Sequence, residues 1–142
     1  MSNVILVPTD GSNGSIKALM YAIDLAKKTD GELILLHVQP NFASPNVKKF
    51  FSKNDVEEYT QMLADEAIEP VKGIMNESGV PYKIKVRIGL PKVEICKETS
   101  EAKADLIVMG YRGLGAVAGV VLGSVSYGVL HDAPCPVTIV RY

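Results

Sequence analysis

Hydrophobic positions along the chain fall into two kinds of stretch that alternate. Short runs rich in β-branched residues occupy 4–8, 32–38, 82–88, 105–109 and 137–140. Between them lie longer stretches in which apolar residues recur at helical spacing, at about 13–28, 54–78, 91–101 and 124–131. Runs of the first kind indicate strands and those of the second kind amphipathic helices. We therefore predict the order βαβαβαβαβ.

The character of the strands indicates the kind of sheet. The run VILVP at 4–8 is apolar without alternation, as parallel strands covered on both faces are. The run at 82–88 instead alternates apolar residues with Lys83, Lys85 and Arg87, which predicts an edge strand with one face open to water. Strands that alternate with helices imply right-handed crossovers. The predicted fold class is α/β: a single-domain, open, parallel five-stranded sheet with helices on both faces, similar to a Rossmann fold.

Two places depart from this regular pattern. The connection at 39–54 is long for a strand-to-helix loop, and we expect a lid or a disordered excursion there, with Phe50 and Phe51 packing over the edge of the domain. Pro70 lies inside the helical stretch 54–78 and is expected to kink it or divide it into two helices.

Composition narrows the classes of function. The chain has 142 residues, with 15 basic and 16 acidic side chains and a formal net charge of -1, so nucleic acid is not an expected partner. Cys96 and Cys135 are too few for a disulfide framework or a zinc site, and the first residues lack the pattern of a signal peptide. We expect a reduced, cytoplasmic setting.

The stretch 113–130 contains no charged residue, and Gly115, Gly119 and Gly123 follow the small-residue spacing of packed membrane helices. Its length alone would allow a membrane span. Its five glycines and the strand-like run directly before it disfavour that interpretation. We expect no membrane association.

Ligands of open parallel sheets bind beyond the carboxyl ends of the strands, where the strand order reverses. The glycine-rich segment 110–123 follows the fourth strand and leads into a helix, an arrangement that lets backbone N–H groups surround phosphate oxygens. A Walker loop is excluded, because no glycine is followed by Lys-Ser or Lys-Thr. The match of Gly113, Gly115 and Ala118 to a dinucleotide fingerprint is accidental, since it follows the wrong strand and lacks the later acidic residue.

The pattern that fits is Gly110-Tyr111-Arg112-Gly113, nine residues, and then Gly123-Ser124. With it stand ILVPTDGS at 5–12, LLHV at 35–38 and APCPVTIV at 133–140. Together these pieces resemble the universal stress protein family, in its ATP-binding branch, over the whole chain. The resemblance implies that residues 1–142 form one domain with a fold like that of the adenine-nucleotide α-hydrolases.

The resemblance also implies a site that binds ATP, with Mg²⁺, across the ends of the first and fourth strands. Asp10 would hold the ribose hydroxyls, Val38 would offer backbone groups to the adenine edge, and the glycines would admit the triphosphate near a helix start that favours anions. The implied site residues are Pro8, Thr9, Asp10, Val38, Met109, Gly110, Arg112, Gly113, Gly123, Ser124, Val125 and Ser126.

Each of these residues also has a simpler interpretation. Asp10 before a glycine is commonly a turn residue, the glycines would permit a tight exit from the fourth strand, and Ser124 would be a helix cap. Tyr111 would either line the phosphate path or crowd it, with Arg112 as its only nearby cation. Gly128 is expected to weaken the last helix by about 1 kcal/mol relative to alanine.

No catalytic residue is predicted. The motif loops contain no Ser-His-Asp or Cys-His arrangement and no metal-ligand cluster; we expect His37 and His131 to be structural or surface residues and Cys96 a buried apolar group. The expected function is that of a nucleotide-dependent regulatory or interaction module with little ATP turnover. A slow ATPase or adenylate-transferring enzyme, and a family member that binds no nucleotide, are the alternatives.

The last strand, at 137–140, is short and close to the end of the chain. As the edge of a sheet it would pair with a copy of itself, giving an antiparallel two-fold homodimer, and the family resemblance points the same way.

Overall fold

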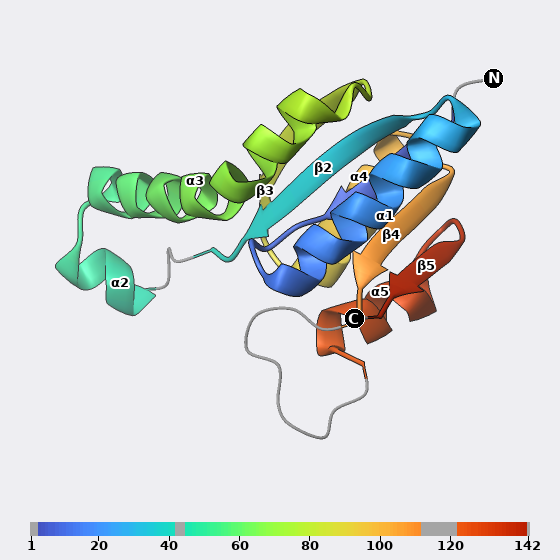
Figure 1. Ribbon diagram of the computed structural model, residues 1–142. Coiled ribbons are helices and arrows are strands. Elements are labelled where there is room, and N and C mark those ends of the chain that lie inside the picture. Colours follow the sequence, from blue (N-terminus) through green and yellow to red (C-terminus); the bar gives the residue numbers. More distant parts are fainter. Residues whose placement is uncertain (1–2, 42–44, 112–121, 142) are drawn as a thin grey trace.

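The computed structural model describes residues 3–41, 45–111 and 122–141 (Figure 1). The strands and helices in chain order are β1 (Val4–Pro8), α1 (Asn13–Thr29), β2 (Glu32–Gln39), α2 (Pro45–Phe50), α3 (Lys53–Ser78), β3 (Tyr82–Ile88), α4 (Pro91–Glu101), β4 (Leu106–Gly110), α5 (Ser124–Asp132) and β5 (Val137–Val140).

The strands form one parallel sheet in the order β3-β2-β1-β4-β5. The chain proceeds from β1 outward to β3 on one side and then crosses to β4 and β5 on the other. The strand order therefore reverses between β1 and β4, where Ile5 lies opposite Leu106. The predicted fold class is confirmed, and β3 and β5 are the two edge strands.

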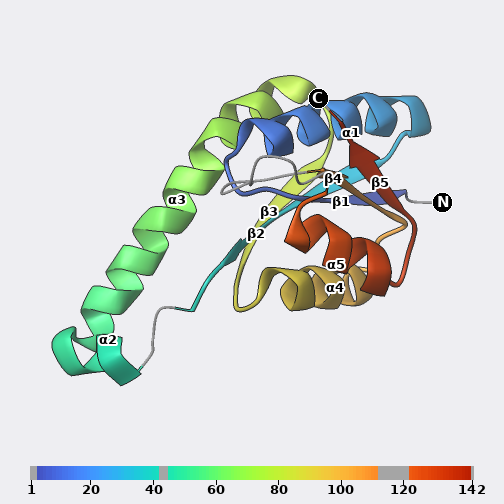
Figure 2. The ribbon, with the colours of Figure 1, turned by 90° about the horizontal axis from the view of Figure 1, so that it is seen from below.

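Helices cover both faces of the sheet (Figure 2). Ile5 and Val7 of β1 pack into a core with α1 and α3, while Val4 and Leu6 pack into a second core with α4 and α5. Successive side chains of a strand point to opposite faces, so a strand buried on both sides must be apolar at every position. That requirement explains the unbroken hydrophobic runs.

The predicted edge strand β3 has a polar face on which Lys83 and Lys85 are exposed, as expected, and Arg87 is half-buried. Lys85 and Arg87 also form ion pairs with carboxylates of α4, among them Glu98 and Glu94. Helix α4 therefore contacts part of this polar face, and the rest of the face is open to water.

The long connection after β2 contains a helix that the sequence pattern did not indicate, α2. Phe50 and Phe51 do not pack over the domain edge as expected; they are 78% and 58% exposed. Figure 2 shows α2 and the first half of α3 extending away from the sheet, and Ala64 is the first buried residue of α3. Helix α3 is continuous through Pro70 and is not divided there.

Helix α3 begins with a capping box in which Ser52 and Asp55 satisfy each other's backbone N–H groups. This cap explains why a helix starts at Lys53 although its first turns lie far from the core. In the described part of the chain, no helix is both long and apolar enough to cross a membrane.

Candidate functional site

The turn between β1 and α1 is held in place from several sides. The backbone N–H of Thr9 donates to the Leu36 carbonyl at 2.9 Å, and the N–H of Ser12 donates to Oδ1 of Asp10 at 2.9 Å. Gly11 has φ +81°, and a Cβ there would lie 3.3 Å from Cα of Ala67 in α3. The turn thus needs glycine both for its backbone conformation and for its close approach to α3.

Helix α1 begins directly after this turn. Ser12 is its N-cap and accepts from the N–H of Ser15 at 3.2 Å. Thr9 is 4% exposed, whereas Pro8 and Asp10 are half-buried. The Asp10 carboxylate therefore lies at the carboxyl edge of the sheet, and one of its oxygens forms the turn that starts α1.

Val38 lies near the end of β2, past the point where the neighbouring strand β1 ends. Pro8 is the last residue of β1 paired with β2, opposite Leu36, so Val38 is two positions further along. The carbonyl of Leu36 faces β1 and that of Gln39 faces β3, and these directions alternate along a parallel strand. The N–H and C=O of Val38 consequently point to the β1 side, into the space past the end of β1.

The end of β4 is tied to the start of α5. Met109 is 5% exposed and Gly110 is buried, and the Ser126 hydroxyl donates to the Gly110 carbonyl at 2.7 Å. The backbone N–H of Gly123 donates to the Tyr111 carbonyl at 2.6 Å. This bond holds Gly123, at the start of α5, next to Tyr111, which directly follows β4.

These bonds change which groups could meet a ligand. The hydroxyl proton of Ser126 and the N–H of Gly123 already have acceptors within the protein. The remaining donors at the start of α5 are the first backbone N–H groups of the helix, at exposed Ser124, half-buried Val125 and buried Ser126, which have no partner within the helix. Gly123 is the N-cap, with an extended backbone at φ −65° and ψ 156°.

Two predicted residues, Arg112 and Gly113, lie outside the described residues. The chain offers a further cation close by, because the Arg141 guanidinium carbon lies 5.8 Å from the ring centroid of Tyr111. The expectation that Arg112 is the only cation near Tyr111 is therefore wrong, because Arg141 also lies beside that ring. The sequence did not indicate Arg141 at this place, because Arg141 follows β5 and comes next to Tyr111 only when β5 joins the sheet.

The strand order brings the predicted pieces together. Because β1 lies between β2 and β4, the Asp10 turn is flanked on one side by Val38 and on the other by Gly110. The site therefore surrounds the point where the strand order reverses, which is where open α/β sheets bind ligands. Across the sheet, this point offers first a backbone donor and acceptor, then a carboxylate and then a helix N-terminus.

Two buried polar residues lie next to this turn: His37, which is structural as expected, and Gln39, which sequence reasoning missed. His37 and Gln39 are 6% and 5% exposed, and the histidine ring lies within hydrogen-bond distance of the Thr9 carbonyl and of the Gln39 side chain. The signal that would have revealed them is the occurrence of two polar residues at alternate positions near the end of an otherwise apolar strand.

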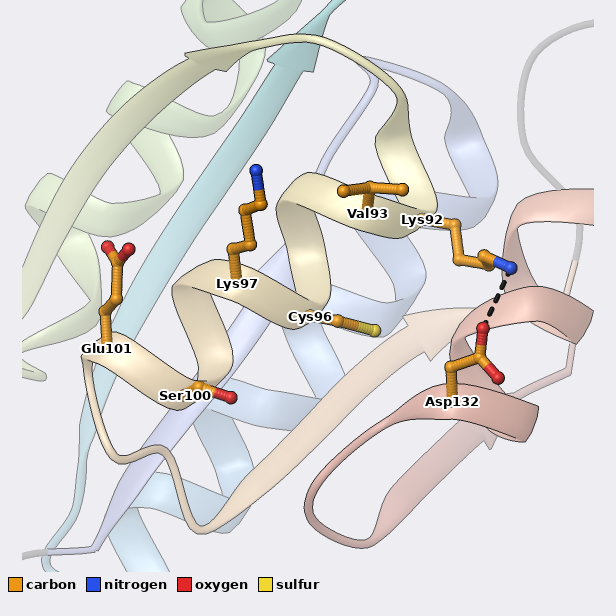
Figure 3. Close-up of a pocket in the computed structure, with 7 residues that line it drawn as sticks. All are labelled: Lys92, Val93, Cys96, Lys97, Ser100, Glu101 and Asp132. Carbon is orange, nitrogen blue, oxygen red and sulfur yellow. Dashed lines mark ion pairs between the residues drawn. The ribbon is translucent and has the colours of Figure 1, made fainter.

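A separate groove of about 460 Å³ lies along α4 and the end of α5 (Figure 3). Its lining residues are Lys92, Val93, Cys96, Lys97, Ser100, Glu101 and Asp132. Cys96 is half-buried, and burial, followed by the charge of Asp132, raises the pKa of its thiol and disfavours the reactive thiolate. No group of three or more metal-binding side chains occurs within the described ranges. The groove therefore contains no evident catalytic chemistry.

Comparison with known proteins places the chain in context. The model of the universal stress protein family matches residues 1–141. A universal stress protein of Methanocaldococcus jannaschii is 34% identical over 137 residues, covering 96% of this chain and 81% of the relative. A solved structure of a protein named MJ0577 is similar with a TM-score of 0.85 and 29% identity, covering 100% of this chain and 97% of that one. A universal stress protein solved in complex with cAMP has a TM-score of 0.71 and 25% identity, covering 97% and 96%.

Proposed function

Because the chain belongs to the universal stress protein family, we propose that it binds ATP, with Mg²⁺, between the ends of β1 and β4 and acts as a nucleotide-dependent regulatory or interaction module in the cytoplasm. Residues 1–142 would form a single domain of this family. The cAMP complex of a similar protein supports an adenine nucleotide as the ligand class. We also propose that the module hydrolyses little or no ATP.

The observation that carries the proposal is the placement of Asp10 between Val38 and Gly110 at the reversal of strand order. The donor and acceptor of the Val38 backbone match the adenine edge, which has both kinds of group. A carboxylate accepts hydrogen bonds from ribose hydroxyls, and the start of α5 favours phosphate charge. These three kinds of group fit the three parts of an adenine nucleotide.

The ion expected with ATP would be held mainly by the phosphates. Mg²⁺ bound to nucleotides commonly keeps several waters and takes few protein ligands, so the site needs no dedicated cluster of carboxylates. Arg141, beside Tyr111, is positioned to add positive charge near the end of β4. The residues of the chain would bind and orient the nucleotide and would not supply a base for its hydrolysis.

The direct test is mass spectrometry of the purified, denatured protein for bound nucleotide, followed by calorimetry with ATP and Mg²⁺. We expect ATP to bind, and Asp10→Ala to weaken it by about tenfold or more, since hydrogen bonds to a charged group contribute about 1.5–3 kcal/mol. Absence of both bound nucleotide and binding heat would support the alternative that binds no nucleotide. Metal-dependent turnover that is lost in Asp10→Ala would support the enzyme alternative.

A second variant tests the phosphate end of the site. Gly123 has a backbone conformation that any residue adopts, so Gly123→Val adds a side chain without strain at its own position. We expect the variant to fold and to lose ATP binding, because the side chain would occupy space next to the phosphates. Gly113→Val, predicted from the sequence alone, is expected to do the same. A folded Gly123→Val variant that binds ATP normally would place the phosphates elsewhere.

A further inference from the structure

Three buried polar residues lie at the carboxyl ends of β1 and β2, on the face covered by α1 and α3. The His37 ring contacts the Thr9 backbone carbonyl and the Gln39 side chain, whereas the Thr9 hydroxyl lies 3.3 Å from the Ser15 hydroxyl. Thr9, His37 and Gln39 are 4%, 6% and 5% exposed. Buried polar groups are costly unless they are hydrogen-bonded, so their partners define what the cluster does. Thr9 was an implied site residue and His37 an expected structural or surface residue, whereas Gln39 was assigned no role.

The histidine ring connects the two strand ends. Its Nδ1 lies 2.9 Å from the Thr9 carbonyl oxygen and its Nε2 lies 2.7 Å from Oε1 of Gln39. A carbonyl oxygen only accepts, so Nδ1 carries the proton and donates to Thr9. The Gln39 amide can serve Nε2 in either orientation, because its oxygen accepts from an N–H and its NH₂ group donates to a bare ring nitrogen.

The bond to the Thr9 carbonyl acts on the next residue. The carbonyl of Thr9 and the N–H of Asp10 belong to the same planar peptide unit, so holding the carbonyl oxygen fixes the direction in which the chain enters Asp10. The N–H of Thr9 is held as well, by the carbonyl of Leu36 at 2.9 Å. With both peptide planes of Thr9 held, its two backbone dihedral angles are set.

The other side of the turn is held by α3, because Gly11 packs directly against the backbone of Ala67. Asp10 thus lies between two constrained residues. His37 itself is 6% exposed and both its nitrogens have protein partners, so it is not placed to touch a ligand.

We propose that His37 is the positioning residue of the ribose subsite: through the Thr9 carbonyl, it holds Asp10 in the orientation that reads the sugar hydroxyls. This inference rests on the proposed nucleotide function. It predicts that loss of the Nδ1 donor lowers discrimination between ribose and deoxyribose, an effect that destabilisation of the core alone would not produce.

The experiment compares ATP, 2′-deoxy-ATP and 3′-deoxy-ATP by calorimetry with Mg²⁺ present. His37→Phe fills the volume of the ring but has no donor, whereas His37→Asn keeps a side-chain N–H close to the position of Nδ1. We expect the wild-type protein to prefer ATP over at least one deoxynucleotide by about tenfold or more. The preference should fall to about threefold or less in His37→Phe and be largely retained in His37→Asn.

Val71→Ala is the matched control, because Val71 of α3 is fully buried in the core that this helix forms with α1 and the sheet but lies outside the hydrogen-bonded cluster. It should lower the unfolding temperature and leave the preference unchanged. In an Asp10→Ala background, His37→Phe should cause no further loss of preference, since the two residues act in one chain of contacts. If His37→Phe folds poorly, His37→Leu serves for the same comparison.

A His37→Phe or His37→Leu variant that keeps the wild-type preference overturns the positioning role and leaves the proposed function intact. Equal losses in His37→Phe and Val71→Ala also overturn it, because the effect would then be one of general stability. A wild-type protein that binds no adenine nucleotide overturns the proposed function, and the ribose subsite with it.

Discussion

Glu98 is a buried carboxylate whose charge is balanced by two cations. It is 3% exposed, and its two oxygens accept hydrogen bonds from Lys85 Nζ and an Arg87 guanidinium nitrogen, each at 2.9 Å. Burial by itself would raise the pKa of Glu98. The hydrogen bonds and charges of Lys85 and Arg87 outweigh it and hold the pKa below its usual range.

The lowered pKa gives this cluster a defined pH dependence. A carboxylate with a lowered folded-state pKa stabilises the fold above its unfolded pKa, about 4.3 for glutamate, and the stabilisation is lost as the pH falls through the folded value. We expect Glu98→Gln to lower the free energy of unfolding at pH 7 by about 1–3 kcal/mol. This effect is smaller than that of removing a fully buried ion pair, because the Lys85 side chain is 43% exposed.

Urea unfolding at pH 7 and pH 3 measures this effect, and the gap between Glu98→Gln and wild type should narrow at the lower pH. Glu101→Gln is the matched control: its side chain is 67% exposed and accepts from Arg87 at 3.1 Å, so little change is expected. A gap of the same size at both pH values would contradict the assignment.

The contact between α4 and α5 gives Gly128 a role. A Cβ at this position would collide with the Lys92 side chain, whose Nζ lies 2.8 Å from Asp132 Oδ2. The hydrogen bond from Lys92 is the main cause of the lowered pKa of Asp132. Gly128, which the sequence marked only as a weak point in a helix, thus makes room for an interaction between two helices.

Two glycine substitutions separate helix propensity from this contact. Gly73 lies within α3 with no atom within 4 Å of an added Cβ, so Gly73→Ala should stabilise the protein by about 0.5–1 kcal/mol. Gly128→Ala should stabilise the protein less, because the Lys92 side chain must move to make room for the added Cβ. Thermal unfolding compares the two variants, and carboxyl NMR titration should show the pKa of Asp132 rising in Gly128→Ala. An unchanged Asp132 pKa would show that Lys92 adapts without leaving its partner.

The two edges of the molecule are not equivalent. Lys85 and Arg87 of β3 are bound to α4, while all four residues of β5 are half-buried. The carbonyls of Pro136 and Val140 face β4, so the N–H groups of Val137 and Ile139 point outward from the sheet. We propose that β5 pairs with its copy through these groups in an antiparallel two-fold dimer.

Proline substitution at each edge tests this proposal. Ile139→Pro removes an outward N–H of β5 and should convert a dimer to a monomer in light scattering coupled to size exclusion. Val86→Pro makes the corresponding change on the outward side of β3 and should leave the dimer intact. Circular dichroism checks that both variants remain folded. A wild-type protein that is monomeric at every concentration, or a dimeric Ile139→Pro, would refute pairing through β5.

The sequence by itself determined the strands, the four longer helices and the parallel sheet, because hydrophobic periodicity is a local property that each segment carries. The bounds of β1, β3 and β5 agree with the expected runs, and the edge positions of β3 and β5 were predicted correctly. Helix α2 and the exposure of Phe50 were not predicted, because hydrophobic periodicity does not show whether another element packs against the apolar side chains.

Only the tertiary structure decided which side chains become neighbours across the sheet. Strand order places Asp10 between Val38 and Gly110, and the closeness of β1 to β2 lets His37 hold the Thr9 carbonyl. These contacts join residues that are far apart in the chain, and their partners depend on register and strand order. The sequence could therefore name the chemical groups of the site, whereas the fold determined which of them already hold one another in place.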